Sequence, residues 1–445
     1  MSRIYNEEND ILYKNYLQDY FFNDFLNPDP EKIKQLEIIV SPKCNLGCKY
    51  CYLHKYYNKS FPPSSFDESK TLENLDKLLN WLHENKYRPN LDIFSGELLA
   101  QKIGYQVLDR IYEFEKKLTK EERFRRITIP TNYTFINSDE EIKQVQKLIY
   151  KFSDLGIPLI LSASFDGKYM DENRPYIHDL DITFNHEYSD EYYDKIFKFN
   201  KKNGFGFHPM VYSKNIDKWK QNFIWFQDMF NKYDIEWKRL YLLQVRNVEW
   251  TEYEIKCFKE FIDFLLEYSF NKCKKTNENF MDFIFIDGGF NILREPFTCS
   301  SKGLPCAMQT EFTVKLNDLT HHPCHRLLYD EFKIGEFIDK GNSIEFCTKN
   351  ASLGLTILGC DKNMFPHCIN CPINSLCIGG CLGAQYEVTG SMFIPIPTVC
   401  KVNLTLVKTI IDFFVTHDIY DDLLTRMSFN NDKYKQIKYI KELEL

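Results

Sequence analysis

LEIIVSPKCNLGCKYC, residues 36–51, joins a short apolar segment to three closely spaced cysteines. The segment 36–40 predicts a β-strand, and Cys44, Cys48 and Cys51 follow directly after it. Three thiolates this close in one loop can hold a single metal centre. In an α/β repeat the carboxyl ends of the strands form the rim where ligands bind, so this position favours a functional centre.

The chain beyond this stretch repeats the alternation of strand and helix. Residues 70–86 place five leucines at helical spacing, and short β-branched segments separate the helical ones. The predicted strands are 36–40, 91–94, 126–131, 158–165, 205–212 and 240–245, and the predicted helices are 70–86, 101–117, 139–155, 217–231 and 252–270. Six strand–helix repeats imply a parallel sheet, because each crossover helix returns the chain to start the next parallel strand. Periodicity alone does not distinguish a closed barrel from an open sheet.

The composition of the 445 residues excludes several classes of protein. Apolar residues make up 44%, which supports a large buried core and excludes a disordered chain. Lys and Arg total 56 against 63 Asp and Glu, so there is no basic excess to bind nucleic acid. No apolar run approaches the ~20 residues of a membrane-spanning helix, and the N-terminus has acidic residues where a signal peptide would be apolar. We therefore expect a soluble, cytoplasmic protein that binds neither nucleic acid nor membranes.

The 15 cysteines point to metal ligation rather than to disulfides. An odd number cannot all pair, and the sequence shows no export signal. After about residue 290 the strand–helix repeat stops and Gly, Pro and Cys become frequent, so something other than hydrophobic burial is expected to organise this region. The predicted divisions are an N-terminal helical segment 1–35, an α/β domain 36–290, a cysteine-rich domain 291–400, and a C-terminal helix and tail 401–445.

Three thiolates suit a four-iron cluster because they leave one iron open to an external ligand. A zinc site completed by His54 explains the spacing equally well. The motif CxxxCxxC, with Tyr50 before its last cysteine, resembles the radical S-adenosylmethionine (SAM) enzymes. The resemblance implies a partial (β/α)6 barrel in which Cys44, Cys48 and Cys51 hold a [4Fe–4S] cluster. In that family SAM binds the open iron and is cleaved to a 5′-deoxyadenosyl radical, which abstracts a substrate hydrogen.

Further motifs at successive strand ends match the same family in order. Ser95-Gly96-Glu97-Leu98 stands where the family has Gly-Gly-Glu-Pro, with both outer positions different, and Thr131-Asn132 ends the third strand. Ser164-Phe165-Asp166-Gly167 ends the fourth strand and resembles the family's Ser-x-Asp-Gly. An ordinary turn explains any one of these, but several in family order favour a SAM site. The residues that the resemblance implies near SAM are Tyr50, Ser95, Gly96, Glu97, Asn132, Ser164, Asp166 and Arg174.

The later cysteines resemble a second feature of this family. Cys368-x2-Cys371-x5-Cys377-x3-Cys381, followed by Cys400, is similar to the SPASM extension of radical SAM peptide maturases. The resemblance implies a loop-rich domain with two auxiliary [4Fe–4S] clusters, and so three clusters in all. The implied ligand sets are Cys299, Cys306, Cys324 and Cys381 for the first auxiliary cluster, and Cys368, Cys371, Cys377 and Cys400 for the second. A zinc ribbon over 368–381 is the alternative.

One histidine and four cysteines remain to be interpreted. His325 follows Cys324 at the position where the related anaerobic sulfatase maturases have an Asp, proposed as the general base. This makes His325 a candidate catalytic base, although a hydrogen bond that supports the cluster is the preferred interpretation. The unassigned cysteines, expected to be structural, are Cys257, Cys273, Cys347 and Cys360.

The resemblance implies an enzyme that modifies a ribosomally made precursor peptide by forming a thioether or carbon–carbon crosslink. The implied cofactors are three [4Fe–4S] clusters and SAM, and the implied partners are the peptide and a reductant protein such as flavodoxin or ferredoxin. Many such maturases begin with a peptide-binding winged-helix domain, but only about 35 residues precede the first strand here. We therefore expect recruitment through a sheet edge, an adaptor protein or the helix after residue 402. The alternatives are a peptide epimerase or decarboxylase, and a non-catalytic metal-binding scaffold.

Overall fold

The computed structural model of this chain describes residues 35–53, 65–184, 186–286, 290–298, 308, 311–341, 343–358, 360–362, 365–377 and 379–443. These residues form two compact units, each built from separate stretches of the chain. The first unit takes its described residues from Met1–Ser164, Arg174–Ile196 and Ala307–Gly359, and the second from Phe165–Asn173, Phe197–Cys306 and Cys360–Leu445. Apart from Gln35, the expected N-terminal helical segment lies outside the described residues. The domain boundaries expected at 290 and 400 stay predictions.

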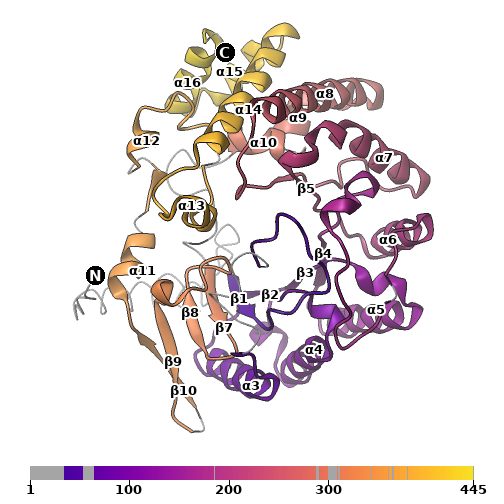
Figure 1. Ribbon diagram of the computed structural model, residues 1–445, viewed down its shortest axis with the longest axis vertical. Coiled ribbons are helices and arrows are strands. Elements are labelled where there is room, and N and C mark those ends of the chain that lie inside the picture. Colours follow the sequence, from indigo (N-terminus) through magenta and orange to yellow (C-terminus); the bar gives the residue numbers. More distant parts are fainter. Residues whose placement is uncertain are drawn as a thin grey trace. The chain divides into compact units, whose positions relative to one another are not determined.

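One eight-stranded sheet forms the centre of the first unit, with the order β10-β9-β8-β7-β1-β2-β3-β4 (Figure 1). Its strands are β1 (Gln35–Ile39), β2 (Asn90–Phe94), β3 (Ile127–Thr131), β4 (Leu159–Ala163), β7 (Glu311–Lys315), β8 (Thr320–His322), β9 (Gly335–Asp339) and β10 (Ile344–Thr348). β1 to β4 pair in parallel, and β7 pairs in parallel with the other side of β1. β8, β9 and β10 continue the sheet in antiparallel pairing. The sheet is open, with β4 and β10 at its edges, which confirms the prediction of a partial barrel.

Helices connect the parallel strands as the alternation predicted. α3 (Glu68–Glu84), α4 (Lys102–Glu115) and α5 (Asp139–Asp154) follow β1, β2 and β3, and they lie along the outside of these strands (Figure 1). The side chains of Asp67 and Ser138 accept hydrogen bonds from the first turns of α3 and α5. Such caps satisfy backbone N–H groups that have no partner within the helix, and they fix where these two helices begin.

The two faces of this sheet differ in character because side chains alternate along each strand. On one face the residues of β1 and β2 are apolar and buried, among them Ile38 and Ile93. The other face carries Glu37, which lies opposite Asp92 of β2 and Thr313 of β7. A row of polar side chains therefore crosses three neighbouring strands. The sequence alternation that predicts the strands also gives this sheet one polar face.

The later strands differ from the prediction of a purely parallel sheet. The expected fifth and sixth strands are reduced to β5 (Met210–Val211) and β6 (Leu243–Gln244), which pair with each other in the second unit. The cysteine-rich region, expected to be rich in loops, instead supplies β7 to β10 to the sheet of the first unit. The prediction was wrong here because strand propensity is weak evidence beside the tertiary pairing that decides which segments join a sheet.

Helices dominate the second unit, and α14 packs along α8 there. The remaining helices of the described chain are α6 (Asp190–Asn203), α7 (Trp219–Lys232), α8 (Glu252–Thr276), α9 (Phe280–Phe285), α10 (Asn291–Thr298), α11 (Ala351–Leu358), α12 (Pro366–Ile369), α13 (Leu382–Thr389), α14 (Pro397–Thr416), α15 (Tyr420–Met427) and α16 (Asn431–Lys441). Short 3-10 helices cover Leu98–Ala100, Lys120–Glu122, Thr134–Asn137, Lys168–Asn173, Ser213–Lys218 and Asp330–Phe332. The expected C-terminal tail therefore contains two further helices, α15 and α16. None of the described helices has the length and apolar character needed to cross a bilayer.

Candidate functional site

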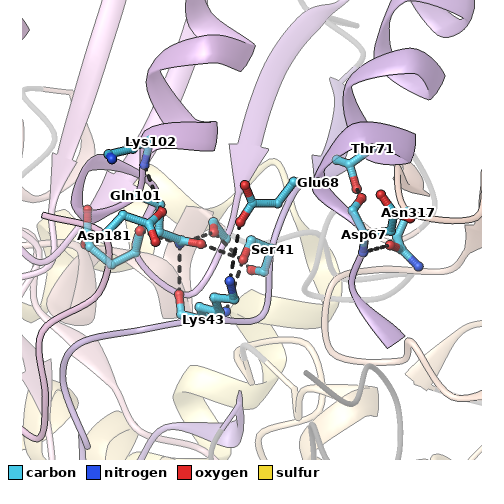
Figure 2. Close-up of polar contacts among 11 residues, drawn as sticks. Ser41, Lys43, Asp67, Glu68, Thr71, Gln101, Lys102, Asp181 and Asn317 are labelled. Carbon is cyan, nitrogen blue, oxygen red and sulfur yellow. Dashed lines mark hydrogen bonds and ion pairs between the residues drawn. The ribbon is translucent and has the colours of Figure 1, made fainter. Parts of the chain in front are cut away.

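A buried amide side chain fixes the loop that carries the first three cysteines. Gln101, the residue before α4, is fully buried, and its Nε2 donates hydrogen bonds to Lys43 O at 3.0 Å and Glu97 O at 2.7 Å. Its Oε1 accepts a hydrogen bond from Ser41 Oγ at 2.7 Å. Figure 2 shows this side chain close to Ser41 and Lys43. Gln101, which no sequence motif singled out, thus joins the loop after β1 to the loop after β2.

The same two loops approach each other closely at Gly96. The N–H of Gly96 donates to Ser41 O at 2.9 Å, and the N–H of Glu97 donates to Lys43 O at 2.9 Å. A Cβ atom on Gly96 would lie 2.1 Å from Lys43 O, a distance that no side chain can adopt without moving the backbone. Ser95 adds a hydrogen bond from its Oγ to Ser41 O at 3.0 Å. Glycine is therefore required at position 96 so that the loop carrying Cys44 can lie against the loop carrying Glu97.

Glu97 is buried and holds the ends of β2 and β3 together. Its Oε1 accepts hydrogen bonds from Leu99 N at 3.1 Å and Thr131 Oγ1 at 2.8 Å, and its Oε2 accepts one from Asn132 N at 2.6 Å. Burial raises the pKa of Glu97 to about 7, although these three donors act to lower it. A carboxylate offers about four acceptor positions, so three internal donors leave room for about one further donor.

The first three cysteines lie partly buried around one point of the loop after β1. Burial raises the pKa of Cys44 well above its ordinary value, and the neighbouring Cys48, Glu97 and Cys51 raise it further. Thiols that raise one another's pKa in this way lie close together, and a bound metal centre is what would hold them as thiolates. His54, the fourth ligand of the zinc alternative, lies outside the described residues.

Within the described part of the chain, no group of three or more His, Cys, Asp or Glu side chains is arranged to hold one metal ion. A four-iron cluster makes a different demand, because each thiolate binds a different iron and the sulfurs stay further apart.

Asparagine side chains tie this loop to the end of β3. Asn132 Nδ2 donates to Asn45 Oδ1 at 2.8 Å and lies 4.0 Å from Cys44 Sγ. Asn45 Nδ2 in turn donates to Thr134 Oγ1 at 2.9 Å. The Asn132 side chain, predicted to lie near SAM, therefore contacts the residue next to Cys44 and the edge of the thiol group itself.

A segment after β4 covers the other side of the loop. Gly47 N donates to Pro175 O at 2.8 Å, and Ile177 N donates to Asn45 O at 3.0 Å. The buried Arg174 places its Nη1 3.4 Å from the hydroxyl of Tyr50. Two residues predicted to lie near SAM, 124 positions apart in the chain, are thus brought together beside the cysteines.

The motif at the end of β4 is divided between the two units. Ser164 belongs to the first unit, where its N–H donates to Thr131 O at 2.9 Å. Asp166 belongs to the second unit, and its buried Oδ1 accepts a hydrogen bond from Met210 N at 2.8 Å. The role of Asp166 that these contacts define is to hold β5, and its predicted contact with SAM stays a prediction.

Residues 38–159, which contain the end of β1, the cysteine loop, β2 and β3, match the family model of the radical SAM superfamily. These residues form a radical SAM domain. Enzymes that contain this domain use a [4Fe–4S] cluster and SAM. The zinc interpretation of the first cysteines has no comparable support.

Two solved structures similar to this chain are of Streptococcus suis SuiB. The crystal structure of SuiB bound to S-adenosylmethionine is 14% identical over 88% of this chain and 79% of that chain, with a TM-score of 0.46. The crystal structure of SuiB bound to precursor peptide SuiA is 14% identical over 88% of this chain and 80% of that chain, with a TM-score of 0.45. No curated protein sequence matches this chain.

His325 is positioned by the polar face of the eight-stranded sheet, the face that carries Glu37. Nδ1 of His325 donates to Glu37 Oε1 at 2.7 Å, and its backbone N–H donates to Glu37 Oε2 at 2.9 Å. Oε2 also accepts a hydrogen bond from Thr313 Oγ1 at 2.8 Å. The His325 ring stacks on Phe94 with centroids 4.4 Å apart and lies 5.6 Å from the ring of Tyr52, the residue after Cys51.

The charges around His325 favour its protonated form. Burial lowers the pKa of His325, but the neighbouring Glu37 and Glu311 carboxylates outweigh that effect and raise it above the ordinary value. Burial, with Glu37 nearby, raises the pKa of Glu311 to about 7. The hydrogen-bond acceptor of His325 is therefore Glu37, and its predicted roles as a support of the cluster or as a catalytic base stay predictions.

Replacing Glu37 with Gln is expected to destabilise the first unit by about 1.5–3 kcal/mol, because one buried carboxylate accepts all three hydrogen bonds. Thr313→Val removes only one of these bonds and should cost about 1 kcal/mol. The midpoint of urea unfolding, measured without oxygen on both variants, checks this order. Equal midpoints for Glu37→Gln and the parent protein would contradict the assigned role of Glu37.

The second unit contains a cavity of about 90 Å³ lined by cysteines. The cysteines on its wall are Cys368, Cys371, Cys377, Cys381 and Cys400. Burial raises the pKa of Cys400 to about 12, with further increases from Cys377, Cys368 and Cys371. Burial likewise raises the pKa of Cys368 to about 11, and Cys377 and Cys371 contribute while Lys362 opposes them. Four thiols therefore interact around this cavity.

The lining of the cavity agrees with one of the predicted ligand sets. The four interacting thiols are the four predicted for the second auxiliary cluster. Cys299 and Cys306 of the other predicted set lie outside the described residues, while Cys324 and Cys381 belong to different units, so that ligand set stays a prediction.

Three of the four unassigned cysteines are buried. Cys257 and Cys273 lie in α8 and are buried, which confirms the prediction for both. Cys360 is also buried, and Cys347 lies on β10 with partial exposure. Burial raises the pKa of Cys360 to about 11, so this thiol stays protonated near neutral pH.

Proposed function

We propose that this chain is a radical SAM enzyme that modifies a ribosomally made precursor peptide and forms a thioether or carbon–carbon crosslink in it. The observation that carries the proposal is the second-unit cavity, where four thiols of the predicted ligand set interact with one another. A cluster held by four cysteines has no open iron for a substrate, so it serves electron transfer better than substrate binding. Removal of an electron is what a crosslink requires, since its formation takes two hydrogens from the peptide.

In this proposal Cys44, Cys48 and Cys51 hold the cluster of the radical SAM domain. When bound, that cluster and SAM supply the 5′-deoxyadenosyl radical that abstracts a hydrogen from the peptide. Gln101 and Gly96 keep the cysteine loop against the loop after β2, which bears Glu97. Glu97 retains about one acceptor position for a donor such as the SAM amino group. The proposed SAM site is completed by Asn132, Ser95, Ser164, Asp166, Tyr50 and Arg174.

The remaining parts of the proposal concern the auxiliary clusters and the partners. One auxiliary cluster is held by Cys368, Cys371, Cys377 and Cys400. The ligands proposed for the other are Cys299, Cys306, Cys324 and Cys381. The partners are the precursor peptide and a one-electron reductant protein such as flavodoxin or ferredoxin.

Iron analysis tests the number of clusters. The anaerobically reconstituted protein should contain about twelve irons per chain, and Cys377→Ala should lower this to about eight. The variant should still cleave SAM, because its radical SAM domain is intact, but it should release no crosslinked peptide. About four irons in the parent protein would contradict the auxiliary clusters, and zinc in place of iron would contradict the enzyme itself.

Mass spectrometry tests the reaction. The substrates to try are peptides encoded by short genes that lie next to the gene for this chain. A crosslink lowers the peptide mass by two hydrogens. An unchanged mass with an inverted residue would show epimerisation, and loss of carbon dioxide would show decarboxylation. Either of these outcomes would contradict the proposed crosslink while keeping the radical SAM chemistry.

A further inference from the structure

A buried lysine lies beside the cysteines of the second unit. Lys362 is only 4% exposed, lines the cavity, and donates from Nζ to the backbone O of Cys377 at 3.0 Å. Burying a lysine side chain is costly unless its charge is compensated. A cluster bound by four thiolates carries net negative charge. In this cavity it would compensate the positive charge of Lys362.

Two N–H groups also point at the sulfur of Cys377. Gly379 N lies 3.2 Å from Cys377 Sγ, and Nδ2 of the buried Asn403 lies 3.6 Å from it. Hydrogen bonds to cluster sulfurs and nearby charge both shift the reduction potential of an iron–sulfur cluster. Two donors and one ammonium group therefore act on the same ligand.

We propose that Lys362, supported by Gly379 and Asn403, raises the reduction potential of the cluster held by Cys368, Cys371, Cys377 and Cys400. Reduction adds one electron and makes the cluster one charge more negative, and a positive charge in a buried site stabilises that reduced state. The inference rests on the proposed function, which supplies the cluster.

A redox titration tests the inference without the activity of the enzyme. The background is the triple variant Cys44→Ala, Cys48→Ala and Cys51→Ala, in which only auxiliary clusters contribute to the electron paramagnetic resonance signal. Adding Lys362→Met should lower the midpoint potential of one cluster so that its reduction equilibrium weakens about tenfold, which equals about 59 mV for a one-electron couple. Lys362→Arg should restore the potential, because it keeps the charge.

Lys401 provides a matched control for the loss of a lysine charge. It follows Cys400 directly, but it is 51% exposed and forms an ion pair with Glu252 at 2.6 Å. Solvent and Glu252 screen its charge, so Lys401→Met should leave both potentials unchanged. Asn403→Leu, which removes one N–H donor, should lower the same potential as Lys362→Met by a smaller amount.

The outcomes separate this inference from the proposed function. Unchanged potentials in Lys362→Met, or an equal shift in Lys401→Met, would overturn the role of Lys362 while leaving the clusters in place. Loss of about four irons from both Lys362→Met and Lys362→Arg would show that Lys362 holds the cluster rather than tunes it, and would also overturn the inference. Absence of any auxiliary signal in the background protein would instead contradict the proposed function.

Discussion

Replacing Cys48 with Ala is expected to abolish SAM cleavage completely and to remove about four irons per chain. Cys48 and Cys51 lie close enough to Cys44 to raise the pKa of its thiol, and two thiolates cannot replace three in holding a cluster with one open iron. The second-unit cysteines should be unaffected, because their cavity is built from other residues. Chromatography of 5′-deoxyadenosine after reduction with dithionite measures the cleavage.

Cys257→Ala is the matched control for this variant. It removes the same side chain from α8, where Cys257 is buried and no cluster ligand is proposed. Its cost is the loss of packing by one small side chain, so iron content and SAM cleavage should stay at the parent level. Retained SAM cleavage in Cys48→Ala would overturn the assignment of the radical SAM cluster ligands.

Gly96→Ala is expected to weaken SAM binding by more than about tenfold and to destabilise the first unit by about 1–3 kcal/mol or more. The added Cβ would lie 2.1 Å from Lys43 O, with Pro42 O next at 2.8 Å. Both contacts are to backbone, so the loop after β1 must move away from the loop after β2. Such a shift breaks the hydrogen bonds from Gly96 N and Glu97 N and separates Cys44 from Glu97.

Gly206→Ala is the control for a glycine without such a contact. A Cβ there would meet its nearest atom, Arg239 O, at 3.4 Å, which is an ordinary contact. Equilibrium dialysis with labelled SAM on reconstituted protein should give parent affinity for Gly206→Ala and weak binding for Gly96→Ala. Parent affinity in Gly96→Ala would show that the two loops need not lie together for SAM to bind.

The first part of the fold could be predicted from the sequence because its signals are local. β1 to β4 and α3 to α5 follow from alternation in the strands and from leucines at helical spacing. The join between β7 and β1 could not be predicted, since Gln35 pairs with Glu311, far away in the chain. Residues 311–315 have ordinary strand propensity, which does not reveal their partner. They join the central sheet because they pair with the side of β1 that β2 leaves open.

The candidate site divides in the same way. Its cysteines could be found because their spacing in the chain is set by the cluster they are proposed to hold. Gln101, Glu37 and Lys362 could not be found, since each acts through a contact with a residue distant in sequence. Their only sign in the sequence is the residue type, and a single Gln, Glu or Lys occurs too often to be informative.

The position of β7 beside β1 has a consequence for how the chain folds as it is synthesised. Until residues 311–315 leave the ribosome, β1 is an unpaired edge, although the cysteine loop and β2 to β4 have already emerged. Glu37 also lacks Thr313 and His325, its hydrogen-bond partners, at that stage. Exposed edges of this kind promote aggregation. A fragment that ends after β4 would therefore contain the whole radical SAM match and still expose the edge of β1 that β7 covers in the full chain.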